Sequence, residues 1–200
     1  ADTVSNAPPP PEQAAAGHAA HRVLMVLESL YPAPSGGSEN QVRTLCRHLA
    51  RRGIRAEVVV PMVAYGRQVA RDRVDQTPLT RLPYPKLRGL GSAIMLVRLA
   101  IYLIRERHNY DAIHAHIAHY MSGVSCVLGR WLGKPVVIKV AGGHEMSRGL
   151  LDGRRRSPQL RLLRWMLRHA TYIQATSTDM AQRLVACGFD PERIRRIPNA

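Results

Sequence analysis

The sequence predicts an α/β fold, a Rossmann-like parallel sheet with helices on both faces. Short, wholly apolar runs such as residues 23–27 and 136–138 are typical of buried parallel strands. Between such runs lie longer segments in which apolar residues recur every three or four positions, as in amphipathic helices. Strands that alternate with helices form βαβ units, whose strands run parallel.

The composition predicts one folded domain preceded by a tail. Hydrophobic residues make up 46% of the 200 residues, which is enough for a sizeable core. Residues 1–21 are rich in proline and alanine and lack both the basic start and the apolar run of a signal peptide, so we expect a disordered tail. The folded domain is expected over residues 22–200. The three cysteines form no ligand pattern, which favours a reduced, cytoplasmic chain.

The first half of the domain is expected to contain a strand at 23–27, a helix from 38 to the glycine at 53, strands at 57–60 and 80–82, and a helix at 90–107. Ser38 and Gln41 have the spacing of a capping box, in which both side chains bind backbone N–H groups at a helix start. Gly53 provides the stop signal at the other end of this helix.

The second half repeats the alternation, with strands at 111–114, 135–140, 172–175 and 194–197 and with helices at 121–132, after 157, and at 178–187. In open α/β sheets of this kind, ligands bind beyond the carboxyl ends of the strands. Chemically active residues are therefore expected directly after the strands.

A glycine pair, Gly36 and Gly37, lies between the first strand and the first helix. Glycines at a helix start leave the backbone N–H groups open, and the helix dipole favours a negative charge there. The pair is thus a candidate phosphate cradle. A plain turn that begins the helix is the structural alternative.

Three histidines, His114, His116 and His119, occur within six positions at the end of a central strand. Along a strand, His114 and His116 point to the same face. A zinc site is disfavoured because no cysteine lies nearby and no fourth ligand has a standard spacing. Two alternatives remain: hydrogen-bonding residues that line a cleft, and histidines buried in the core.

A second glycine pair, Gly142 and Gly143, ends the next strand and is followed by His144 and Glu145. The glycines allow a substrate to approach the backbone, and the His-Glu pair is suited to acid-base work or to binding sugar hydroxyls. A flexible loop with a solvated ion pair is the structural alternative.

The chain is strongly basic, with 29 Lys and Arg against 14 Asp and Glu and a formal net charge of +15. Such a charge attracts phosphates, anionic lipid headgroups or nucleic acid. Six arginines without an intervening acid form a candidate contact with an anionic surface, or else a solvated face of a packed helix: Arg154, Arg155, Arg156, Arg161, Arg164 and Arg168. The longest apolar stretch, 90–104, is shorter than the roughly 20 residues of a membrane-spanning helix.

Three motifs together resemble glycosyltransferase family 4: Tyr-Pro-Ala-Pro-Ser-Gly-Gly-Ser-Glu at 31–39, Tyr-Asp-Ala-Ile-His-Ala-His at 110–116 and Arg-Ile-Pro-Asn at 196–199. Lys-Pro-Val-Val at 134–137 and Ala-Thr-Ser at 175–177 add to the resemblance, which covers residues 22–200. It implies the amino-terminal half of a GT-B enzyme, in which two Rossmann-like domains face each other across a cleft. The first domain binds mainly the acceptor, and the second binds the nucleotide-sugar.

The resemblance also implies roles for the candidate residues. Gly36 and Gly37 would approach the diphosphate of a UDP- or GDP-sugar donor, while His116 and the loop with Gly142, Gly143, His144 and Glu145 would line the sugar and acceptor side. Transfer in this family retains the anomeric configuration and needs no metal or other cofactor. Ala141-Gly142 stands where many members have His-Gly. The catalytic residue is therefore unassigned, with His144 as its nearest candidate.

We thus expect the acceptor-binding domain of a retaining, metal-independent hexosyltransferase whose acceptor is a glycan or a lipid-linked sugar. The chain ends where the family continues into the donor-binding domain, so the 200 residues alone are expected to be inactive. The expected location is the cytoplasm, at the inner face of the membrane, in polysaccharide biosynthesis. The alternative is a non-catalytic module that binds anions or nucleic acid, although the chain shows no nucleic-acid-binding signature. A dehydrogenase would need a GxGxxG motif after the first strand, which is missing.

Overall fold

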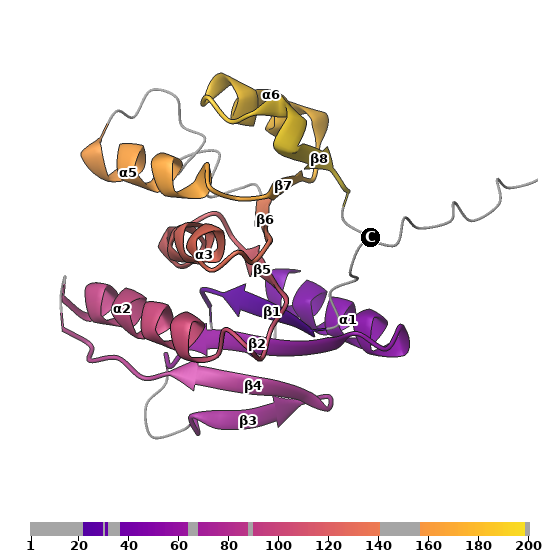
Figure 1. The fold of residues 1–200 in the computed structure, drawn as a ribbon, viewed down its shortest axis with the longest axis vertical. Coiled ribbons are helices and arrows are strands. Elements are labelled where there is room, and N and C mark those ends of the chain that lie inside the picture. The colour runs from indigo at the N-terminus through magenta and orange to yellow at the C-terminus, as the bar shows by residue number, and fades with distance from the viewer. Residues whose placement is uncertain are drawn as a thin grey trace, which may run out of the picture.

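The computed structural model describes residues 22–29, 31, 37–63, 68–87, 90–140 and 157–198. They form one eight-stranded sheet with the strand order β3-β4-β2-β1-β5-β6-β7-β8 (Figure 1). The strands are β1 (Arg22–Leu27), β2 (Arg55–Pro61), β3 (Arg71–Val74), β4 (Thr77–Leu82), β5 (Ala112–His116), β6 (Val136–Val140), β7 (Tyr172–Ala175) and β8 (Ile194–Arg196). All neighbours pair in parallel except β3 and β4. The predicted α/β fold class is confirmed.

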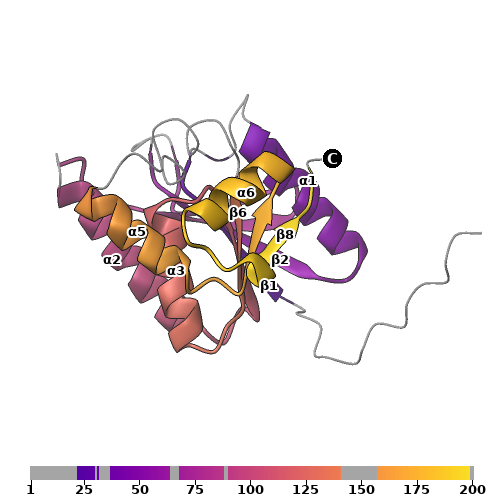
Figure 2. The same ribbon diagram turned by 90° about the horizontal axis from the view of Figure 1, so that it is seen from above.

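The helices are α1 (Gly37–Arg51), α2 (Leu90–Arg105), α3 (Tyr120–Trp131), α5 (Pro158–Leu167) and α6 (Thr178–Ala186), with a short 3-10 turn at Pro191–Arg193. In both ribbon views α2, α3 and α5 lie side by side along one face of the sheet, and α1 lies on the other (Figures 1 and 2). Ser157 and Ser177 cap α5 and α6, because each hydroxyl accepts the backbone N–H three residues later. The expected tail at 1–21 lies outside the described residues.

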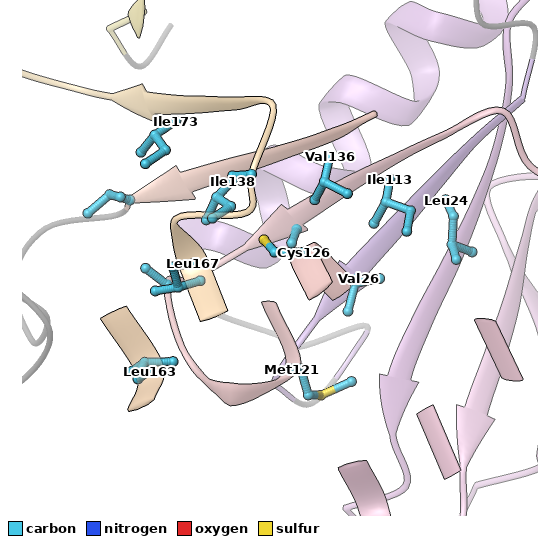
Figure 3. Close-up of a cluster of buried hydrophobic side chains, with 14 of the residues drawn as sticks. Leu24, Val26, Ile113, Met121, Cys126, Val136, Ile138, Leu163, Leu167 and Ile173 are labelled. Atoms are coloured by element: carbon cyan, nitrogen blue, oxygen red, sulfur yellow. The ribbon is translucent and has the colours of Figure 1, made fainter. Parts of the chain in front are cut away.

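The strands alternate between two cores. Leu24 and Val26 of β1 point into the larger core, which also contains residues of α2, α3, α5 and α6. Figure 3 shows part of this core, with Met121 and Cys126 of α3 and Leu163 and Leu167 of α5. Met25 and Leu27 point to the opposite face and pack with Val42 and other residues of α1 and β2. Since in-register neighbours in a parallel sheet share a face, these two cores assign a face to the side chains of β5 and β6 as well.

The sequence prediction missed strand β3, and it placed the start of α1 incorrectly. Strand β3 is a polar, largely exposed edge strand that pairs antiparallel with β4 through a turn at Asp75 and Gln76, both of which have positive φ. Helix α1 begins at Gly37, so Ser38 lies inside it and donates a hydrogen bond to Glu39. The predicted capping box is wrong, because Gln41 instead accepts a hydrogen bond from Lys139 of β6.

Candidate functional site

Polar side chains gather at the carboxyl ends of β5 and β6, on the face of the sheet that carries α1. The register of β5 places His114 beside Met25 and His116 beside Leu27, and both of these β1 residues face α1. Strand β6 continues this row, because Lys139 is paired with His116. The opposite face of the same strands is apolar. The carboxyl edge of the sheet is where open α/β folds bind ligands.

His114 and His116 share a face, as the strand prediction required, and their ring centroids are 4.4 Å apart. His116 is 2% exposed. In the part of the chain that the structure describes, neither ring nitrogen of His116 has a hydrogen-bond partner, nor does Nε2 of His114. Burial lowers the pKa of His114 to about 4 and that of His116 well below its ordinary value, and nearby positive charge acts in the same direction. Both imidazoles are neutral at pH 7.

Lys139 is the member of this site that sequence reasoning missed. The residue is 6% exposed, and its ammonium group donates a hydrogen bond to the side-chain oxygen of Gln41 on α1. Burial lowers the pKa of this lysine. The signal was present in the sequence, since a single lysine interrupts the apolar run of residues 136–140. A lysine in a buried strand is rare unless it has a partner or a function.

Glu28, directly after β1, connects this edge to the start of α3. One of its carboxylate oxygens lies 2.7 Å from Nδ1 of His119, and the other accepts the backbone N–H of Met121 at 3.1 Å. The carboxylate therefore occupies the N-terminus of α3, where the helix dipole favours negative charge. Ile117, with a φ of 72°, turns the chain so that His119 leaves the line of the strand. His119 is thus separated from the other two histidines.

Of the two glycine pairs predicted to bind substrate, the structure describes only Gly37. Gly37 is the first residue of α1, and a Cβ atom there would meet nothing within 4 Å. Gly36 lies outside the described residues, as do Gly142, Gly143, His144 and Glu145.

The chain from residue 35 to 200 matches the family model described as Glycosyltransferase Family 4. This match covers most of the chain. The chain belongs to glycosyltransferase family 4. No curated protein sequence matches the chain.

Solved structures agree with the fold of this family 4 domain. Anabaena Alr3699/HepE, crystallised with UDP and glucose, matches with a TM-score of 0.63 and 17% identity over 90% of this chain and 44% of its own. Sucrose-phosphate synthase from Thermosynechococcus elongatus has a TM-score of 0.66 at 15% identity, over 89% of this chain and 48% of its own. UDP-GlcNAc 2-epimerase from Methanocaldococcus jannaschii has a TM-score of 0.60 at 13% identity, over 89% of this chain and 45% of its own. The chain therefore spans less than half the length of these proteins.

Three of the six arginines predicted to contact an anionic surface are described in the family 4 domain. Arg161 and Arg164 lie on α5, and Arg168 follows its last residue and donates a hydrogen bond to the Cys187 carbonyl at 3.4 Å. Trp165 is 52% exposed and lies one turn after Arg161. Arg154, Arg155 and Arg156 lie outside the described residues.

Two further features of the described residues concern metal ions and membranes. Among the described ranges, no three His, Cys, Asp or Glu side chains are grouped so that they could hold a metal ion. Within the same ranges, none of the helices has the length and apolar character that a bilayer crossing requires.

Proposed function

We propose that this domain is the acceptor side of a retaining, metal-independent glycosyltransferase, completed by a second domain that binds the donor. The observation that carries the proposal is the row of buried, neutral imidazoles at the carboxyl edge of a family 4 domain. A neutral imidazole offers one donor and one acceptor, which suits the hydroxyl groups of a sugar. The glycosyltransferases among the structural neighbours support the same reaction class.

In the proposed reaction, the bond between the anomeric carbon and the leaving diphosphate breaks, and a bond to the oxygen of an acceptor hydroxyl forms on the same face of the sugar. The proton of that hydroxyl leaves with the diphosphate. The domain contributes positioning rather than covalent chemistry. His116 would hold a sugar hydroxyl, and Gly36 and Gly37 would let the donor diphosphate approach the amides of α1. Gly142, Gly143, His144 and Glu145 would line the acceptor side. The structures of Anabaena HepE with UDP and with UDP-glucose support a UDP-sugar donor, and GDP-sugars are the alternative.

The proposal is tested by comparing the 200-residue chain with a longer form that includes the proposed donor-binding domain. Both are assayed for UDP or GDP release from a panel of nucleotide-sugars with glycan and lipid-linked acceptors. We expect release by the longer protein alone, because the active site needs donor-binding groups from both sides of the cleft. Sugar transfer by the 200-residue chain would contradict the two-domain requirement. Absence of turnover in both forms would favour the alternative, a non-catalytic module for anions or nucleic acid.

We also propose that α5 places the domain against an anionic membrane surface. Leu162 and Trp165 are each 52% exposed, and they share a helix face with Arg161. Apolar and aromatic side chains beside arginines are the composition of helices that bind at lipid headgroups.

Replacing Trp165 with serine is expected to weaken binding to vesicles that contain an anionic phospholipid about tenfold, measured by co-sedimentation, because the exposed indole no longer enters the headgroup layer. Trp131→Ser is the matched control, since Trp131 is 71% exposed at the end of α3. Vesicle binding that survives replacement of all six arginines would exclude this surface.

A further inference from the structure

Among the residues that the structure describes, the ammonium group of the buried residue Lys139 has no acidic partner. Lys139 as a whole residue is 6% exposed, and its ammonium group donates a hydrogen bond to the neutral side chain of Gln41. None of the ion pairs formed within the described residues includes it. An ion that leaves water without a counter-charge costs several kcal/mol, so buried lysines are normally paired.

The described residues that hydrogen-bond or pair with Lys139 carry no negative charge. His116, its in-register neighbour on β5, is buried with both ring nitrogens unpartnered among the described residues, and His114 lies beside His116. Gln41 lies one turn after Gly37, so the ammonium group sits near the amino end of α1. That end of a helix carries partial positive charge and repels a cation. The hydrogen-bond partner and the in-register neighbour of Lys139 are thus neutral, and the helix end near it carries partial positive charge.

We propose that Lys139, with His116 and the first turn of α1, binds a phosphoryl group of a substrate. This proposal deepens the function proposed above and rests on it. An ammonium group has three N–H donors, of which Gln41 accepts one, and a neutral imidazole supplies one more. Phosphoryl oxygens are strong acceptors that favour lysine as a point charge and helix amino ends as N–H donors. The bound phosphoryl group would supply the negative charge that pairs with the Lys139 ammonium group.

The test measures inorganic phosphate binding to the 200-residue chain by calorimetry and by the rise in Tm. Lys139→Met removes the charge but keeps an unbranched side chain. We expect a loss of phosphate affinity of about 10- to 100-fold, as for the removal of a charge-assisted hydrogen bond. We also expect the Tm of this variant without ligand to equal or exceed that of the unchanged chain, because an uncompensated buried charge is gone.

The matched control is Lys134→Met, which removes the same charge just before the start of β6, at the opposite edge of the sheet. This variant should keep the phosphate affinity. A Lys139→Met variant that binds phosphate as well as the control does would overturn the proposal. In case the Lys139→Met variant does not fold, the unchanged chain gives an independent readout. Phosphate should shift the NMR signals of the Gln41 side-chain amide and the Gly37 amide, and signals that stay unmoved would also overturn it.

The phosphoryl group could belong to the donor or to a phosphorylated acceptor, and two further ligands distinguish them. If UDP binding depends on Lys139, the group is the donor diphosphate; if only a short alkyl phosphate depends on it, the group belongs to the acceptor. Binding of glucuronate but of no phosphate would overturn the proposal. Sugar transfer without phosphate binding would refute this inference alone, and phosphate binding without transfer by the longer protein would refute the proposed function alone.

Discussion

Acidification from pH 7 to pH 4 is expected to lower the free energy of unfolding of this domain by about 3 kcal/mol through His114 alone. Burial lowers the pKa of this histidine from 6.5 to about 4 in the folded chain. Between these values the unfolded chain binds the proton and the folded chain does not. Stability is therefore complete above pH 6.5 and is lost as the pH falls toward 4. His116, whose pKa is lowered further, adds to the loss.

The measurement is urea unfolding at half-unit steps between pH 7 and pH 4. His114→Gln should flatten the profile in this window, whereas His48→Gln, at an exposed position of α1, should leave it unchanged. Asp75 and Asp111 affect the free energy of unfolding at lower pH than the histidines do, because hydrogen bonds from Arg43 and Arg22 lower the pKa values of these two carboxyl groups. A profile that is flat above pH 5 in the unchanged chain would show that the histidines are solvated.

Replacing Gly129 with alanine is expected to destabilise the domain by about 2 kcal/mol. Gly129 lies in α3 where the helix crosses β6, and an added Cβ atom would overlap Cγ2 of Val136 and lie 3.1 Å from the Lys134 carbonyl oxygen. A rigid strand cannot move aside, so α3 would shift away from the sheet. This loss exceeds the gain of about 1 kcal/mol that alanine normally brings to a helix.

The control for this substitution lies on the same helix. At Gly123 the nearest atoms to an added Cβ are Cβ, Cε and Sδ of Met166, at 3.2 to 3.3 Å. The last two atoms belong to a flexible side chain that can move, and none of the three overlaps as Val136 does, so the effect of Gly123→Ala should be within about 1 kcal/mol. In a double-mutant cycle, Val136→Ala should reduce the cost of Gly129→Ala, because the overlapping methyl group is removed. Additive effects in urea unfolding would mean that steric overlap is not the cause.

The sequence was informative where local patterns decide the structure. Apolar runs and helical periodicity gave the parallel strands and most helices, and the two-residue period placed His114 and His116 on one face. Strand β3 was missed because residues 71–74 are polar and mostly exposed, so pairing with β4 rather than apolar burial makes them a strand.

The site depends on contacts between residues far apart in the chain, which local patterns do not reveal. Gln41 and Lys139 are 98 positions apart, and Glu28 and Met121 are 93 apart. The capping-box prediction failed for the same reason, since a local partner for Gln41 was assumed when a distant strand supplied it. The family resemblance led to the correct fold and family, but its assignment of individual residues remains a prediction.

The pairing of β1 with β5 has a consequence for the speed of folding. The two strands lie side by side at the centre of the sheet, yet Arg22 and Asp111, which join their ends, are 89 residues apart. All other parallel neighbours are connected by shorter segments, so each half of the sheet can assemble locally. Pairing β1 with β5 closes the longest loop in the sheet. It therefore costs the most chain entropy before any contact between the two halves has formed. We expect this closure to limit the folding rate, and both halves to expose an unpaired strand until it occurs.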